Sequence, residues 1–455
     1  MASWRNSLPL LLEQVGYNLR GGFLVRPLII AVMLGIAGAV FSSLEEAFPI
    51  LSAWVPHVLF PSHADPQVSQ TILESIATAM MTVVSIVFAI LLMTLTLASM
   101  QFSPRIIVSF SQDRVTQQTL GIFLGTFAYC LAALPAARTL PHPFAPVATV
   151  LGAMLLALAC IAWLLYFIHH ISLAVSVNYI VDRIAGETEK VIDELMPRPL
   201  RESRLLSPGA EAIPNAQETP VVSERSGYIR FVNTRRLVLL ARHFGITVRV
   251  LRRVGHFVPA GVPLLMVSKG HKLSAASMAD LVGAFDIGPT RTLQQDVEYG
   301  ILQIVDIALK AISPAVNDPS TAISCVDQLS RILIRFASRE PLESVLYNPP
   351  GVVRVYIPWL SFDRLVESAF EQIRLYAKSD VAVNLRMLRA LSDIAATVSD
   401  PAACRALAEQ GRRTVAGAAE QLGEQEMGEI HARLATLEVS ALEESALEVS
   451  AIAPG

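Results

Sequence analysis

A row of small and hydroxyl-bearing residues runs along the longest apolar stretch of the chain, residues 75–100, and begins just before it. The row consists of Thr71, Ser75, Thr78, Thr82, Ser85, Ala89 and Thr96. Their spacings of three, four or seven place them on one face of a helix. Such residues let helices approach closely and hydrogen-bond across the contact. They can also line a wet pathway in which hydroxyls replace part of an ion's hydration shell. Both interpretations stay open.

Glu74 lies at the outer end of the same stretch. If several chains assemble around this helix, its carboxylates form a ring that attracts cations. In a single chain it is simply a solvated helix end. In the next apolar stretch, Gly121 and Gly125 form a GxxxG pattern, which is typical of helix packing.

His169 and His170 follow the aromatic run Trp163–Phe167 near the inner end of the last apolar stretch. Neighbouring side chains on a helix point about 100° apart, so the two imidazoles cannot hold one metal ion together. We interpret the pair as an interfacial anchor, because amphipathic rings collect at the headgroups. Proton sensing or contact with a partner is the alternative.

A polar segment separates the second and third apolar stretches. Its candidate residues are Gln101, Arg105, Asp113 and Arg114. Pro104 ends the preceding helix, and the two arginines can contact lipid phosphates. The alternative is a gate or joint that contacts the soluble part of the chain.

A second polar segment, SPAVNDPSTA, contains Asn317 and Asp318. Asp318 suits a helix N-cap with Pro319 at the first helical position, where the missing N–H costs least. A polar binding site at these two residues is the alternative.

The elements that position these residues follow from composition. Of the 455 residues, 53% are hydrophobic and only 16% charged, whereas soluble domains carry about 25% charged residues. Residues 1–181 hold six of the 36 basic residues and six of the 39 acidic ones. The first part is therefore predicted to be a membrane region and the second a water-soluble one. The net charge of −3 gives no case for nucleic-acid binding.

Four apolar stretches are long enough to cross a bilayer. They are residues 24–44, 75–100, 115–137 and 145–174. Cleavage of the first as a signal peptide is disfavoured, because a lead of about 26 residues is long for such a peptide. Arginines alternate between the two sides in agreement with the positive-inside rule, which predicts an inner-membrane protein with both termini in the cytoplasm.

The rest of the chain is predicted to be cytoplasmic and of the α+β class. Residues 182–225 form a helix and linker, 226–289 a small β domain, 290–437 a helical domain and 438–455 a disordered tail. Helices are expected at about 361–378, 381–399 and 402–437. The segment GHFVPAGVPLL resembles the half-motif of barrel-sandwich carrier folds, but Lys269 lacks the flanking methionines that a carrier lysine needs.

No catalytic pattern is present: GxGxxG, the Walker loop, HExxH and GxSxG are all absent from the sequence. The four cysteines lie far apart and suggest neither a disulfide framework nor a zinc site. We therefore expect no enzyme activity, no cofactor and no metal.

Three segments carry a family resemblance. They are QFSPRIIVSFSQDRVTQQTLGIFLGTFAYC, FIHHIS and DIALKAISPAVNDPSTA. Together with the four-span layout they resemble an uncharacterised bacterial family of predicted membrane proteins, a domain-of-unknown-function family. The resemblance runs from about residue 24 to about residue 399. It implies a location and an architecture, but no activity.

The leading hypothesis is an oligomeric pore for ions or small solutes, lined by the hydroxyl face of the second span and controlled by the cytoplasmic domain. The expected partners are the lipid bilayer and further copies of the chain. A non-conducting sensor or scaffold that holds a cytoplasmic protein is the alternative. A membrane enzyme acting on lipid has only Arg105, Arg114 and the histidine pair in its favour.

Overall fold

The chain divides into two compact units, Met1–Ser176 and Val177–Gly455. The structure is a computed structural model, and it describes residues 25–48, 50, 65–101, 113–139, 143–174, 176–197, 218–348 and 351–452. The division falls at residue 176, close to the boundary at 181 that the distribution of charge predicts.

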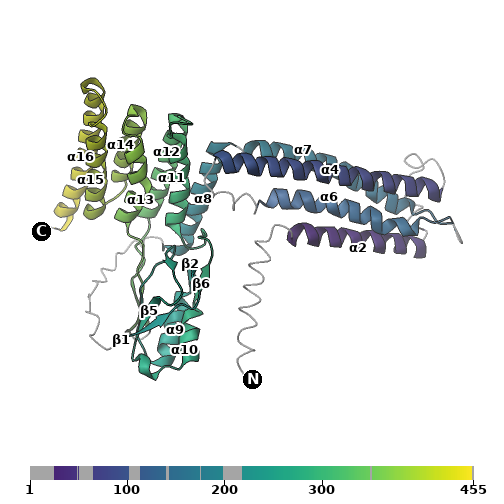
Figure 1. Ribbon diagram of the computed structural model, residues 1–455, viewed down its shortest axis with the longest axis horizontal. Coiled ribbons are helices and arrows are strands. Elements are labelled where there is room, and N and C mark those ends of the chain that lie inside the picture. Colours follow the sequence, from purple (N-terminus) through teal and green to yellow (C-terminus); the bar gives the residue numbers. More distant parts are fainter. Residues whose placement is uncertain are drawn as a thin grey trace. The chain divides into compact units, whose positions relative to one another are not determined.

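The first unit contains four long apolar helices that lie side by side (Figure 1). They are α2 (Val25–Ala47), α4 (Pro66–Gln101), α6 (Arg114–Ala133) and α7 (Val147–Ala174). Each is long and apolar enough to cross a membrane, as the hydropathy pattern predicts. Helix α6 contacts the other three helices. Half of the residues in its most apolar segment are buried, against 17% in each of the other three. It is therefore the central helix of the unit.

Glycines bring α2 and α6 together. A Cβ atom on Gly125 would lie 2.4 Å from Cδ1 of Leu34, and one on Gly121 would lie 2.7 Å from Cδ1 of Ile30. On the facing helix, a Cβ on Gly38 would lie 2.5 Å from the backbone oxygen of Tyr129. The GxxxG pattern thus packs against α2 of the same chain.

The longer helices of the second unit stand next to one another (Figure 1). They are α8 (Val177–Leu195), α11 (Val297–Ala311), α12 (Pro319–Ala337), α13 (Phe362–Tyr376), α14 (Val381–Ala395), α15 (Pro401–Ala418) and α16 (Glu424–Ile452). The single helix expected at 402–437 is thus two helices. Helix α16 also covers most of the range 438–455, where we expect a disordered tail. Leucine, glutamate and alanine are strong helix formers, and they make up most of this range.

Acidic residues cap the two helices nearest the polar segment SPAVNDPSTA. Asp296 accepts a hydrogen bond from Tyr299 N at the start of α11, and Asp318 accepts one from Thr321 N at the start of α12. Asn317 has a φ of 50°, a left-handed conformation that asparagine tolerates better than most residues.

Two open sheets lie at one end of these helices (Figure 1). One has the order β1-β5-β3-β8-β7 and the other β4-β2-β6. The strands are β1 (Glu218–Val222), β2 (Gly227–Val232), β3 (Val248–Val250), β4 (Phe257–Val258), β5 (Pro263–Ser268), β6 (Phe285–Gly288), β7 (Val345–Asn348) and β8 (Val352–Tyr356). Closure into a barrel-sandwich stays a prediction.

The sheet region differs from the expected β domain in two ways. First, α9 (Thr234–Phe244) and α10 (Ala275–Val282) interrupt residues 226–289; Leu237 and Ala241 on α9 are buried four residues apart in the core, as on a helix. Second, β7 and β8 come from the range expected to be helical, and β8 pairs in parallel with β3. A pairing between strands so distant in sequence leaves no local signal.

Candidate functional site: the outer face of α4

Helix α4 presents two opposite faces with different chemistry. One face contains the buried residues Leu73, Ala77, Met80 and Val87 and packs toward α6 and α7. The other face is exposed in the single chain. It carries all seven residues of the predicted row, namely Thr71, Ser75, Thr78, Thr82, Ser85, Ala89 and Thr96. We call this set the outer face of α4.

The outer face follows a strict 4-3 spacing. With the exposed Leu92, its positions are 71, 75, 78, 82, 85, 89, 92 and 96, which is the a/d pattern of helices that pack along a common seam. The inner face repeats in the same way two residues later. Two residues on a helix turn through about 200°, so the two seams lie on opposite sides of α4.

Five hydroxyl groups of the outer face donate their protons to backbone oxygens within α4 itself. Ser75 Oγ donates to Thr71 O at 2.6 Å, Thr82 Oγ1 to Thr78 O at 3.1 Å and Ser85 Oγ to Met81 O at 2.9 Å. Thr71 and Thr96 donate in the same way at 2.8 Å. Because the protons point back into the helix, the lone pairs of the oxygens face outward.

The exposed faces of the neighbouring helices have a different composition. Helix α2 exposes Leu28, Ile29 and Met33, and α7 exposes Leu155 and Leu165. Large aliphatic side chains of this kind suit contact with acyl chains. The outer face of α4 instead has small side chains, all of which bear a hydroxyl group except that of Ala89. Glu74 is also exposed and lies beside this face, near the start of α4.

Two sequence motifs meet where α6 begins and α7 ends. His170 Nε2 on α7 lies 3.1 Å from Asp113 Oδ2, and Asp113 also accepts hydrogen bonds from the backbone N and Oγ1 of Thr116. Tyr166 stacks on His170 with ring centroids 6.4 Å apart. Trp163 Nε1, nearby on α7, donates to Thr119 Oγ1 on α6 at 2.9 Å. The histidine thus ties α7 to the cap of α6.

The other residues predicted for this region are not brought into that cluster. His169 and Arg114 are exposed. Gln101 is the last residue of α4, and its side chain lies outside the described residues, as does all of Arg105. In the second unit, Asn317 lines a hollow of about 400 Å³ together with Tyr376 and Asp380, which keeps the polar-site alternative open there.

Sequence reasoning missed Glu45. This residue at the end of α2 is fully buried, and its carboxylate accepts hydrogen bonds from Ala148 N at 2.7 Å, Thr149 N at 2.8 Å and Thr149 Oγ1 at 2.7 Å. It thus caps the N-terminus of α7 from another helix, where negative charge is favoured. The sequence offers only one sign of this role, a carboxylate at the end of an apolar stretch. Many apolar stretches end in a carboxylate, so this sign does not single out Glu45.

Charged residues in the second unit form paired networks. Three arginines on one side of α12 and just after it pair with acids of α8: Arg331 with Asp182 and Glu189, and both Arg335 and Arg339 with Asp193. Hydrogen bonds from Arg335 and Arg339 lower the pKa of Asp193 to about 2. These pairs fasten α8 to the helical part of the unit.

A second network joins the sheets to the helices. Glu298 on α11 lies 3.0 Å from the guanidinium of Arg253 and 3.0 Å from that of Arg291, and Arg291 also contacts Asp296 at 2.8 Å. Burial acts to raise the pKa of Glu298, but the hydrogen bonds from the two arginines outweigh it and lower the pKa.

Among the described residues, no cluster of three or more His, Cys, Asp or Glu could hold a metal ion.

Comparison with known proteins identifies the family. The profile of a family described as "Predicted membrane protein (DUF2254)" matches residues 20–393. The chain belongs to this family. Together with the four apolar helices, membership makes it a membrane-associated protein, as the family resemblance implies.

Mycobacterial relatives share most of the chain. "Uncharacterized protein Mb1321c" of Mycobacterium bovis and "Uncharacterized protein Rv1290c" of Mycobacterium tuberculosis are each 32% identical to it over 390 residues. The match covers 84% of this chain and 73% of each relative. No solved structure matches the chain.

Proposed function

We propose that this protein assembles into an oligomer in which the outer faces of α4 from several chains turn toward a common centre, and that these faces line a path for small cations across the bacterial inner membrane. The unit Val177–Gly455 lies in the cytoplasm, as do both termini, and controls the path. The observation that carries the proposal is the contrast between the outer face of α4 and the aliphatic faces of α2 and α7.

The composition of the outer face favours a helix neighbour. Helices pack most closely in a bilayer where small residues repeat along a seam, and this face keeps a small residue at every a/d position except Leu92. Lipid acyl chains would make fewer apolar contacts with such a surface than with the large aliphatic side chains of α2 and α7.

The direction of the hydroxyl groups favours a cation. The oxygens present lone pairs, because their protons are donated to α4 carbonyls. Oxygen lone pairs replace water around a cation, as carbonyl oxygens do in selective pores. Glu74, one turn from Thr71 and Thr78 on the same helix, would add negative charge at one end of the path.

Flux measurements test the proposal. Purified full-length protein in lipid vesicles should pass Na⁺ or K⁺ faster than empty vesicles, and Thr82→Leu with Ser85→Leu should lower that flux at least tenfold. The matched control is Ile86→Leu with Phe88→Leu, which adds the same side chains at exposed positions outside the row and should leave the flux unchanged.

Two results would overturn the proposal. One is flux no greater than in empty vesicles. The other is equal flux from the two double variants. An assembled protein that conducts nothing and copurifies with a stoichiometric soluble protein would favour the scaffold alternative instead.

A further inference from the structure

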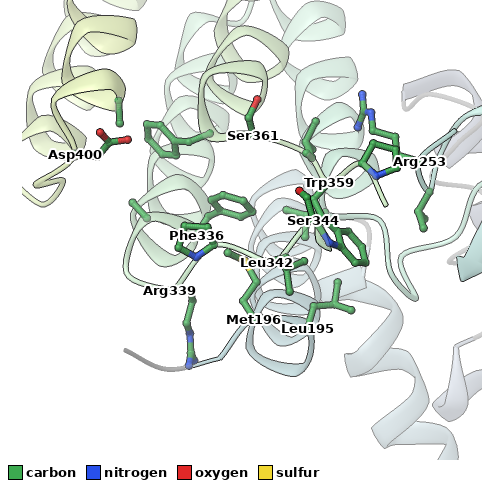
Figure 2. A pocket seen from close by; sticks show the side chains of 18 of the residues that line it. Leu195, Met196, Arg253, Phe336, Arg339, Leu342, Ser344, Trp359, Ser361 and Asp400 are labelled. Atoms are coloured by element: carbon green, nitrogen blue, oxygen red, sulfur yellow. The ribbon is translucent and has the colours of Figure 1, made fainter. Parts of the chain in front are cut away.

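A cavity of about 550 Å³ lies inside the second unit. Its walls come from the end of α8, the segment after β3, the start of α11, the segments on either side of β7 and β8, and the start of α15. Figure 2 shows the side chains around it. The volume falls within the range of about 300–1,000 Å³ that is usual for small-molecule sites.

Aromatic and aliphatic side chains form most of the lining. Phe336 stacks on Phe362 with ring centroids 6.4 Å apart, and Trp359 lies across the cavity from Phe336, beside Ser344 (Figure 2). The indole N–H of Trp359 donates to Glu343 O at 3.0 Å, which fixes the ring. Leu195 and Met196 of the α8 end close another side. Such walls suit a planar, largely apolar molecule.

The charged residues of the lining are all engaged within the protein. Arg253 pairs with Glu298, and Arg339 with Asp193. Asp296 is held by Arg291, while Asp400 accepts from Ala402 N at 2.9 Å as the cap of α15. The lining therefore contains two positive and two negative side chains, so its net charge is zero. A charged ligand would therefore enter without a free counter-charge, at a large cost in desolvation.

A few polar groups remain for orientation. Ser361 precedes α13 without making a capping hydrogen bond from its side chain, and Figure 2 shows the hydroxyl of Ser344 near Trp359. A small number of hydroxyls in an apolar cavity is the usual means of fixing the pose of a ligand.

We propose that this cavity binds an uncharged, largely apolar small molecule with a planar aromatic ring, which packs between Trp359 and the Phe336–Phe362 stack and hydrogen-bonds to Ser344. The inference goes beyond the proposed pore and does not depend on it, because the cavity lies wholly within Val177–Gly455.

The chain carries its own reporter for this site. Its four tryptophans are Trp4, Trp54, Trp163 and Trp359, so replacing the first three by phenylalanine in the full-length protein leaves a tryptophan only in the cavity wall. The probe is 2-naphthol, which is uncharged at neutral pH and whose lowest absorption band overlaps the short-wavelength edge of tryptophan emission. Titration in lipid nanodiscs should quench Trp359 in a saturable manner, above the linear background of probe dissolved in lipid.

Variants separate binding in the cavity from other binding. Ala337→Phe fills the cavity and should weaken saturable quenching at least tenfold, and Leu342→Phe is a second filling variant should the first fail to fold. Ala432→Phe adds the same ring on an exposed side of α16 and should leave quenching unchanged. Ser344→Ala should weaken it several-fold.

The charge of the probe tests the ligand class. Naphthalene-2-sulfonate should bind at least tenfold more weakly than 2-naphthol. Equal or tighter binding of the sulfonate would overturn the assignment of an uncharged ligand. Quenching that never saturates, or that Ala337→Phe and Leu342→Phe leave unchanged, would overturn the site itself.

Discussion

His170 Nε2 lies 3.1 Å from Asp113 Oδ2, although 57 residues separate the two in the chain. Each belongs to one of the sequence motifs that carry the family resemblance, and the neighbouring His169 is exposed. We expect His170→Ala to lower the free energy of unfolding by about 0.5–1.5 kcal/mol, the usual net value of one hydrogen bond. His169→Ala should change it by less than about 0.5 kcal/mol. Thermal unfolding of the purified protein in detergent measures both, and equal effects would show that the contact does not stabilise the protein.

Glu45 should be the acidic residue whose loss costs most in the first unit. It is fully buried and accepts three hydrogen bonds at the start of α7. Hydrogen bonds to a charged group are worth about 1.5–3 kcal/mol each, so Glu45→Ala should destabilise the protein by at least about 3 kcal/mol. Its neighbour Glu46 pairs with Arg138 at the surface, and Glu46→Ala should cost no more than about 1 kcal/mol. The ratio of folded yields in mild detergent gives a first measure, and similar losses in both variants would count against the cap.

Glycine substitutions test the close approach of α2 and α6. Gly38→Ala places a Cβ 2.5 Å from the backbone oxygen of Tyr129, so the helices must move apart, at a cost of about 1–3 kcal/mol. Gly186→Ala on α8 meets nothing within 4 Å and should stabilise its helix by up to about 1 kcal/mol. Opposite shifts in unfolding temperature are therefore expected. If Gly38→Ala left the unfolding temperature unchanged, α2 would not pack against α6 as described.

The pairing of Asp193 should appear in the pH dependence of stability. Hydrogen bonds from Arg335 and Arg339 lower its pKa to about 2, below the unfolded value of about 3.9. Because the folded-state pKa is the lower one, the pairing stabilises the protein above about pH 4, and this stabilisation is lost as the pH falls from about 4 toward 2. Asp193→Asn should remove that part of the pH dependence.

The same variant should also be less stable at neutral pH, by about 1–3 kcal/mol, because the guanidinium of Arg339, only 4% exposed, loses its anionic partner. Urea unfolding at pH 7 and pH 3 measures both effects when it is followed by the emission of Trp359 in the background with the other three tryptophans replaced by phenylalanine. The neighbouring Glu194→Gln, at an exposed position, is the control. Identical pH profiles for the wild type and Asp193→Asn would contradict the assignment.

Local chemistry made much of this architecture predictable. The four apolar helices follow from hydropathy, and the start of α12 follows from the capping residue Asp318 with Pro319. The spacing of Thr71, Ser75 and Thr78 was enough to place them on one face. That they lie on the exposed face of α4 depends on which side packs against α6, and the sequence holds no local sign of that.

The features that escaped prediction depend on contacts between distant residues. The parallel pairing of Val248 with Val355 and the contact between Asp113 and His170 join segments with no shared local pattern. Helix α9 was missed for a different reason: the sequence around it is rich in valine, isoleucine and glycine and favours short strands, while the burial of Leu237 and Ala241 reflects a helical period. The cavity beside Trp359 is formed by six separate segments of the second unit, and no single segment indicates it.

Chemical block of single cysteines on α4 tests the central claim most directly. In a background with the four native cysteines replaced by alanine, Thr82→Cys and Ser85→Cys place a thiol on the outer face of α4, while Met81→Cys and Phe88→Cys place it at exposed positions outside the row. If this face lines the path, a membrane-impermeant cationic methanethiosulfonate should block cation flux in vesicles at positions 82 and 85 and leave it unchanged at 81 and 88. Equal block at all four positions, block at none of them, or the absence of flux would contradict the claim.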